Sequence, residues 1–180
     1  DAEFDQLLVG VGNGPPWNHR ARRAGQGDNL FLASILALDP DTGLYKWHYQ
    51  VNPAESWDFT ATQQMTLADL TIDGRLRKVV MQAPKNGFFY VIDRSNGKLI
   101  SAEAYAPQNW AERIGIASGR PVEKPGIRYV DKPYVIYPSG IGAHAGMPMS
   151  YSPKTGLVYL PMMIVPLSLG DDVNYTRHVG

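Results

Sequence analysis

The chain has 180 residues, no cysteine, and 17 basic residues that are balanced by 17 acidic ones. The absence of cysteine excludes disulfides, thiolate zinc sites and covalent haem attachment within this chain, and the balanced charge argues against nucleic acid or an anionic membrane as a partner. No apolar run approaches the ~18 residues of a membrane span, and the first five residues, DAEFD, have no signal-peptide character. Without a signal peptide, the chain is expected to be either intracellular or a piece of a longer protein.

The strongest structural signal is a turn that recurs at Asp39–Gly43, Asp93–Gly97 and Ser152–Gly156. Each copy separates two apolar runs rich in β-formers, and its final glycine supplies the positive φ that closes a tight turn. These turns predict β-hairpins. A further hairpin is predicted between 63–70 and 77–82. No window holds a sustained 3.6-residue apolar period, so helix is expected to be a minor component.

Glycine turns that recur every ~40 to 60 residues between strand pairs fit repeated four-stranded sheets better than a sandwich. We therefore predict an all-β fold, a β-propeller segment of about two to three antiparallel blades, over approximately 1–52, 53–106 and 140–180. A long connection is expected over 107–139. The tight turns would lie on one face of the blades and the longer loops on the other, where a rigid scaffold can position chemical groups.

A short basic cluster, His19 to Arg23, lies in a stretch rich in glycine and proline, where we expect a solvated loop. Just before it, Asn13 stands between two glycines. Its amide oxygen is a hard ligand suited to Ca²⁺, and the alternative is an asparagine in left-handed conformation that caps a turn. Asp58 stands between Trp57 and Phe59, whose aromatic surface would tend to desolvate it, as a general base requires. The alternative is a loop aspartate bonded to local backbone amides.

Two later loops hold further candidates. Asn86 and Gly87 predict a type I′ turn, and Lys85 beside them is either a surface residue or a point-charge partner for an anionic cofactor. His144 could be a ligand, a base or a buried histidine that is satisfied by the backbone, and the last alternative is favoured. The chain has no glycine-rich nucleotide loop and no Gly-x-Ser-x-Gly elbow, so nucleotide binding and serine hydrolysis lose their usual markers.

As a set, these motifs resemble the alcohol dehydrogenases that depend on pyrroloquinoline quinone (PQQ), the quinohaemoprotein type in particular. The resemblance is carried by residues 12–17, 27–43, 57–61 and 82–94. The stretch that ends at Trp47 is also similar to the family's tryptophan-docking repeat, in which the indole packs between adjacent blades. The resemblance implies an eight-bladed propeller, of which this chain would supply about two blades and part of a third.

The resemblance also implies roles for single residues. Asn13 and Asp58 match calcium ligands, and Asp58 also matches the catalytic base. Lys85 matches the cation that bonds the quinone, with the remaining predicted cofactor contacts at Asn86, Gly142 and Ala143. In the implied reaction, Asp58 takes the hydroxyl proton of an alcohol while hydride passes to PQQ, whose carbonyl is polarised by Ca²⁺.

Calcium is expected because Thr60 stands where lanthanide-using relatives carry a further aspartate. The implied protein is periplasmic, oxidises alcohols or aldehydes, and passes electrons to a cytochrome, with any haem c in a part of the protein outside this chain. The alternative function is a non-catalytic PQQ-repeat propeller module that serves as a binding or assembly scaffold. Because an open piece of a ring leaves sheet edges bare, we also expect this chain to self-associate.

Overall fold

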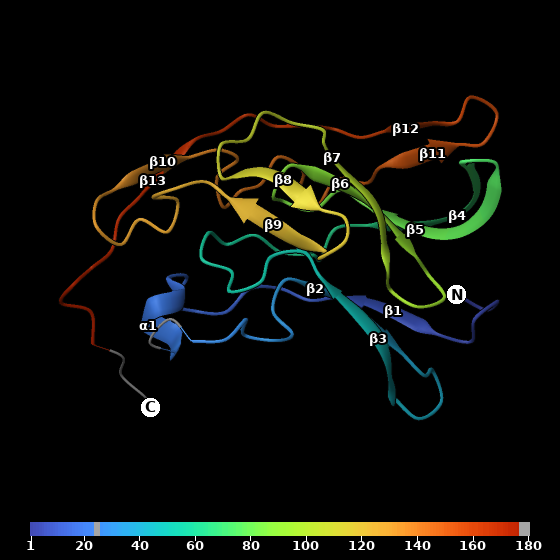
Figure 1. Cartoon of the computed structure of the whole chain (residues 1–180), viewed down its shortest axis with the longest axis horizontal. Helices are drawn as coiled ribbons and strands as arrows, with labels where there is room; N and C mark the ends of the chain where they lie inside the picture. Colours follow the sequence, from blue (N-terminus) through green and yellow to red (C-terminus); the bar gives the residue numbers. More distant parts are fainter. Residues whose placement is uncertain (24–25, 177–180) are drawn as a thin grey trace.

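The structure is a computed structural model that describes residues 1–23 and 26–176, and it is built almost entirely from antiparallel β-strands (Figure 1). The predicted all-β class is therefore confirmed. The described helix α1 is a single short one, His19–Arg23. The strands, in chain order, are β1 Leu7–Gly10, β2 Ser34–Leu38, β3 Tyr45–Gln50, β4 Met65–Ile72, β5 Arg75–Gln82, β6 Phe88–Asp93, β7 Leu99–Ala104, β8 Ala111–Gly115, β9 Arg120–Glu123, β10 Tyr134–Ile136, β11 Ser150–Ser152, β12 Leu157–Tyr159 and β13 Leu167–Leu169.

Two sheets form the body of the molecule, with strand orders β1-β2-β3 and β4-β5-β6-β7. Each strand pairs with its sequence neighbour, as in the predicted blades. The hairpin β11–β12 forms a separate two-stranded sheet after them. The first sheet lies within residues 1–52 and the second within 53–106, and the division of the chain into blades at those bounds stays a prediction.

The predicted glycine turns are confirmed as hairpin turns. In Asp39–Gly43, Asp93–Gly97 and Ser152–Gly156, the amide of the final glycine donates to the carbonyl of the first residue over 2.9, 2.8 and 2.9 Å. The three glycines have φ of 72°, 75° and 71°. Between β4 and β5, Asp73 and Gly74 both have positive φ, the pattern of a two-residue type I′ turn.

The prediction of a type I′ turn at Asn86-Gly87 is wrong. Only Gly87 has a positive φ, whereas that turn needs two such residues, and β5 and β6 are joined by the longer connection 83–87. The physical reason is that the Asn86 side chain is buried, where its amide nitrogen donates to Tyr90 Oη and to Asn52 Oδ1, each over 2.8 Å.

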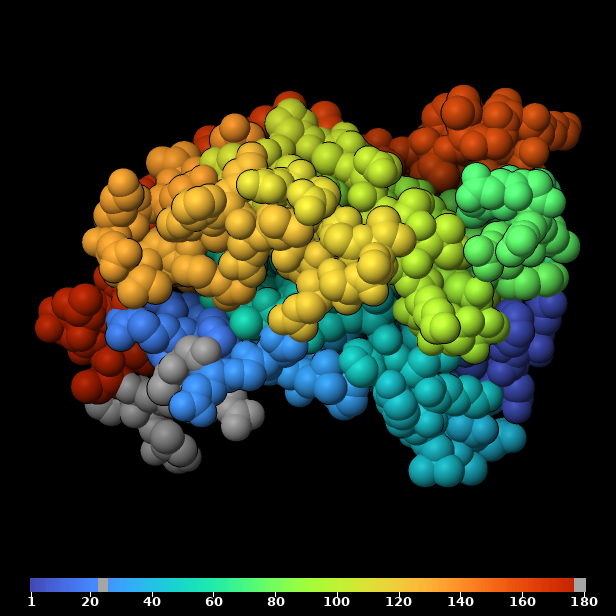
Figure 2. All heavy atoms as spheres, viewed as in Figure 1, coloured from blue at the N-terminus to red at the C-terminus, as the bar shows by residue number. Residues whose placement is uncertain are grey.

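The connection over 107–139 contains more structure than the sequence indicated. It forms the hairpin β8–β9, which Figure 2 shows on the surface in the middle of the visible face (yellow), and the strand β10, which pairs with β13. The hairpin closes through a bond of 2.8 Å from the Gly119 amide to the Gly115 carbonyl. Trp110 and Ile114 bury their side chains beneath it, which explains why the segment packs onto the sheets.

The expectation of a solvated basic loop near residue 20 is also wrong. The segment forms α1, in which His19 is buried and its amide donates to Ser56 Oγ over 3.1 Å. The Arg22 guanidinium donates to the carbonyls of Gly14 and Pro16 over 2.9 and 2.8 Å. This arginine therefore organises the loop that follows β1. None of the described helices has the length and hydropathy of a membrane span.

Trp47 joins the first sheet to the second, as the tryptophan-docking resemblance implies. Its side chain is 6% exposed, and its indole nitrogen donates to the Arg94 carbonyl over 3.1 Å and to Gln6 Oε1 over 3.0 Å. The ring lies so close to Gly97 that a Cβ there would stand 2.6 Å from an indole carbon. The turn between β6 and β7 therefore needs glycine for this packing as well as for its positive φ.

Candidate functional site

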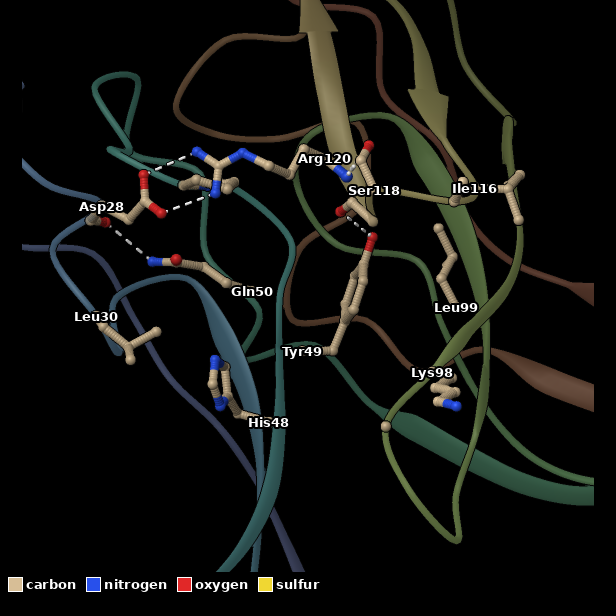
Figure 3. Close-up of a pocket in the computed structure, with 14 residues that line it drawn as sticks. Asp28, Leu30, His48, Tyr49, Gln50, Lys98, Leu99, Ile116, Ser118 and Arg120 are labelled. Carbon is tan, nitrogen blue, oxygen red and sulfur yellow. Dashed lines mark hydrogen bonds and ion pairs between the residues drawn. The ribbon is translucent and has the colours of Figure 1, made fainter.

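One hollow of the described structure, of about 640 Å³, lies between β3, the β6–β7 turn and the β8–β9 turn. Two of its charged residues, Asp28 and Arg120, are bonded to each other through two contacts of 2.7 and 2.8 Å (Figure 3). The Tyr49 hydroxyl on its wall donates to the Gly119 carbonyl over 2.8 Å. This hollow holds none of the predicted site residues, and its main polar groups already have partners.

A second hollow, of about 440 Å³, is lined by Asp58 and by mostly apolar side chains, among them Trp17, Ile141 and Val165. An apolar hollow with a few convergent polar groups is the usual form of a small-molecule site. We take this hollow as the candidate site, although it is smaller than the first, because Asp58, the residue predicted to act as a base, lines it.

Asp58 and Lys85 come together at this site, as predicted. Lys85 Nζ lies 3.1 Å from Asp58 Oδ2 and 3.1 Å from the Asp58 carbonyl oxygen. The two side chains are 20% and 16% exposed, so the pair is largely shielded but still open to a ligand. Asp58 belongs to the connection between β3 and β4, and Lys85 to the connection between β5 and β6. Two loops at one end of neighbouring sheets therefore build the charged pair.

Asp58 faces outward because its neighbours face inward. Trp57 and Phe59 are both fully buried, and each ring packs against Trp110, with centroids 5.5 and 5.6 Å apart. Asp58 itself has a φ of 64°, the left-handed region that aspartate tolerates better than most residues. The two rings pack with Trp110 in the core, whereas Asp58 lies beside the hollow and Lys85 with 20% of its side chain exposed, so its desolvation by the two aromatics stays a prediction.

The desolvated carboxyl of this loop belongs to Glu55, which the sequence reasoning missed. Glu55 is fully buried, and burial raises its pKa to about 7. Glu55 Oε1 accepts hydrogen bonds from the amides of Trp57 and Phe59 over 2.5 and 2.9 Å, while Oε2 has no partner among the described residues. The available signal was an acidic residue shortly before two aromatics. When both rings are buried, their backbone amides lie in the interior and need an acceptor, which such a carboxylate can supply.

Gly142 and Ala143 hold the main chain of Lys85. The Ala143 amide donates to the Lys85 carbonyl over 2.9 Å, and Ala143 is fully buried. Gly142 has a φ of 94°, and a Cβ there would stand 2.5 Å from Lys85 Cγ. The amide nitrogen of Asn86 donates inward, to Asn52 and Tyr90. These three residues support Lys85, and their direct contact with a cofactor stays a prediction.

Replacing Gly142 with alanine should therefore disturb Lys85 more than a comparable change elsewhere. The Gly156→Ala variant is a matched control, because Gly156 also has positive φ but nothing lies within 4 Å of the added Cβ. In both variants the free energy of unfolding should fall by about 1–2 kcal/mol, because alanine is strained in the left-handed conformation. In Gly142→Ala the free energy of unfolding should fall by about 1–3 kcal/mol more, because the new methyl group would overlap Lys85. Urea unfolding measures the difference, and equal losses in the two variants would show that Lys85 is not held by this contact.

Asn13 is half-buried and lies at the end of the segment that follows β1. Its φ is not positive, so the alternative of a left-handed turn cap is wrong. Its side chain has no hydrogen bond to the part of the chain that the structure describes. The Val11 carbonyl accepts from the Ala61 amide over 3.1 Å, which holds this segment beside the Asp58 loop. No hydrogen bond joins the described side chains of Asn13 and Asp58, and their shared role as metal ligands stays a prediction.

His144 is buried, with Nδ1 and Nε2 each 2.7 Å from a backbone carbonyl, those of Ala83 and Met147. The favoured alternative, a buried histidine satisfied by the backbone, is confirmed. Thr60 is also buried, and its hydroxyl accepts from Gln63 Nε2 over 3.1 Å. Both side chains are therefore engaged inside the protein.

The residues of the site fit part of a calcium and quinone site. Ca²⁺ takes six to eight oxygen ligands. Asp58 offers a carboxylate and Asn13 offers an amide oxygen without a described partner, which is a partial set, and Lys85 offers a cation to an anionic cofactor. Within residues 1–23 and 26–176, no group of three or more His, Cys, Asp or Glu side chains could hold a metal. A complete calcium site would need further ligands.

The comparisons with known proteins show the family and the fold of the chain. Residues 1–112 match the PQQ family, which is described as "Glucose/ethanol/alcohol dehydrogenase, beta-propeller domain". The "Quinohemoprotein alcohol dehydrogenase ADH IIB" of Pseudomonas putida is 63% identical over 166 residues, which is 92% of this chain and 24% of that protein.

The crystal structure of the quinohemoprotein alcohol dehydrogenase from Comamonas testosteroni is 53% identical to this chain and superimposes with a TM-score of 0.95. The match covers 98% of this chain and 26% of that structure. The chain thus spans about a quarter of the length of these two proteins, and its fold is that of a propeller segment.

Proposed function

Because the chain belongs to the PQQ β-propeller family of glucose, ethanol and alcohol dehydrogenases, we propose that it forms part of the active site of a dehydrogenase that oxidises alcohols or aldehydes. The observation that carries the proposal is the Asp58–Lys85 pair, with 3.1 Å between Nζ and Oδ2, at the edge of an apolar hollow. A carboxylate beside a cation and an apolar wall suits the binding and deprotonation of a small alcohol.

In this proposal, Asp58 accepts the hydroxyl proton of the substrate. The apolar wall, which includes Trp17 and Val165, receives the alkyl part of the alcohol and excludes water from the carboxylate. Lys85 bonds an oxygen of the cofactor, and Asn13 and Asp58 supply oxygen ligands to Ca²⁺. PQQ supplies the hydride acceptor and Ca²⁺ the Lewis acid when both are bound. Lys85 and Asp58, from two separate loops, already lie 3.1 Å apart. Both groups are therefore in place before the substrate enters.

Titration with PQQ and Ca²⁺ tests this assignment in the full-length protein that carries the chain. We expect binding of both, and we expect Asn13→Ala to weaken the affinity for Ca²⁺ by at least about tenfold, since outer-shell changes at metal sites alone cost that much. Asn96→Ala, in an exposed turn, should have no effect. An unchanged affinity in Asn13→Ala would remove this residue from the metal site, and failure of the unmodified protein to bind either ligand would favour a non-catalytic scaffold.

The names of the relatives, which include a quinohemoprotein alcohol dehydrogenase and a 1-butanol dehydrogenase (cytochrome c), support a cytochrome or haem group as the electron acceptor. We propose a periplasmic location because the family resemblance implies it. We also propose that this chain alone self-associates. Leu157, Tyr159 and Ile164 are 54%, 54% and 60% exposed, which leaves apolar surface at the C-terminal hairpin. Sedimentation should show a mass that rises with concentration, whereas a compact monomer at every concentration would contradict self-association.

A further inference from the structure

We propose that Glu55 is a positioning residue for Asp58, because one oxygen of its carboxyl group binds both backbone amides that flank Asp58. This inference rests on the proposed function, in which Asp58 is the base. Glu55 itself contacts neither the substrate hollow nor Lys85. Its effect on the reaction would pass through the backbone of the loop.

The geometry of the loop depends on this one oxygen. Oε1 accepts from the Trp57 amide over 2.5 Å and from the Phe59 amide over 2.9 Å, and the described residues provide no other acceptor for either amide. Bonds on both sides of Asp58 fix the direction in which its side chain leaves the backbone. They also hold Asp58 at its φ of 64°, a conformation that persists only where the surroundings enforce it.

Other contacts hold the rest of the loop, and Lys85 Nζ donates to the Asp58 carbonyl, but among the described residues only Glu55 accepts from the amides on each side of Asp58. The Tyr129 hydroxyl donates to the Ser56 carbonyl over 2.5 Å, and the Trp57 indole donates to the Ile127 carbonyl over 3.1 Å. The Arg22 guanidinium donates to the Glu55 carbonyl. None of these bonds reaches the amides beside Asp58. If Glu55 lost its acceptor, two buried donors would be unsatisfied, and the backbone would rearrange to satisfy them.

The experiment compares Glu55→Gln with Glu55→Leu in the full-length enzyme. Glutamine keeps an Oε1 acceptor of the same shape, whereas leucine fills the space without one. We expect kcat to stay within about threefold of the parent in Glu55→Gln and to fall roughly 100-fold in Glu55→Leu, with KM for the alcohol and PQQ content little changed, because misplacement of a reacting group by about 1 Å costs that much. Rescue by glutamine separates acceptor geometry from charge.

Gln6→Leu is the control for general damage. Gln6 is buried and, like Glu55, bonds through its side chain, but its partners are Asp1, Arg94 and Trp47. Its kcat should match the parent even if its thermal midpoint falls. A Glu55→Leu enzyme with parental kcat, or a Glu55→Gln enzyme as slow as Glu55→Leu, would overturn the positioning role.

Hydrogen exchange of the unmodified enzyme keeps the proposal testable if Glu55→Leu does not fold. The amides of Trp57 and Phe59 should be strongly protected, and rapid exchange at either would overturn the proposal. The Asp58→Asn variant distinguishes a failure of the proposed base, Asp58, from a failure of the positioning role of Glu55. If that variant keeps its turnover, the proposed base is wrong, although protection at the two amides would persist. If it loses turnover while Glu55→Leu does not, only the positioning role is wrong.

Discussion

Replacing Asp58 with asparagine in the full-length enzyme should lower kcat by roughly 10²–10⁴-fold, the usual contribution of a general base. Asparagine keeps the size of the side chain and tolerates the left-handed backbone at φ 64°, so the fold and the position of Lys85 should change little. The neutral amide cannot accept the hydroxyl proton. Steady-state alcohol-dependent dye reduction, with PQQ content measured on the same sample, gives the result.

Asp73→Asn is the matched control, because Asp73 is also an aspartate with positive φ, at 50°, and lies in the exposed turn between β4 and β5. Its activity should equal that of the parent. Turnover that survives in Asp58→Asn with PQQ bound would remove Asp58 from the role of base. A loss of bound PQQ together with turnover would instead point to a mainly structural role for this carboxylate.

Replacing Trp47 with alanine should cost about 3–5 kcal/mol of unfolding free energy, the range for truncation of a buried aromatic. The indole is 6% exposed, fills the space against Gly97, and donates to the Arg94 carbonyl and to Gln6 Oε1. Its removal would leave a cavity between the first and second sheets and two buried acceptors without this donor. Denaturant unfolding measures the change.

Tyr45→Ala on the same strand is the comparison, because Tyr45 is 54% exposed. We expect it to cost less than about 1 kcal/mol, as surface changes generally do. A Trp47→Ala variant that is no less stable than Tyr45→Ala would show that the two sheets do not depend on this indole for their contact.

The hairpins were predictable from sequence because their signals are local. A glycine that closes a turn, as in Asp39–Gly43, leaves few other conformations for its neighbours, and the apolar runs on each side supply the strands. The same holds for the meeting of Asp58 and Lys85. Once sheets follow one another along the chain, loops at the same end of each sheet must lie on one face.

The errors arose where distant contacts decide the local structure. The Asn86 side chain is drawn into the core by Asn52 and Tyr90, which overrides the turn preference of Asn-Gly. Arg22 is bound by carbonyls of its own loop and of Glu55, which a local count of basic residues cannot show.

The fully buried carboxyl of Glu55 was not predicted, for a related reason. Asp58 and Glu55 lie in one loop, and the sequence shows that aromatics neighbour both. It does not show to which side each ring turns. That depends on Trp110, which lies more than 50 residues later and packs against both rings. The full burial of Glu55 and the partial exposure of Asp58 therefore follow from tertiary packing.

A crystal structure of the full-length protein with PQQ and Ca²⁺ tests the central proposal most directly. We predict a quinone oxygen within hydrogen-bonding distance of Lys85 Nζ, and a metal ion coordinated by oxygens of Asp58 and Asn13. A quinone that binds away from Lys85, or a metal ion that binds away from Asp58 and Asn13, would contradict it.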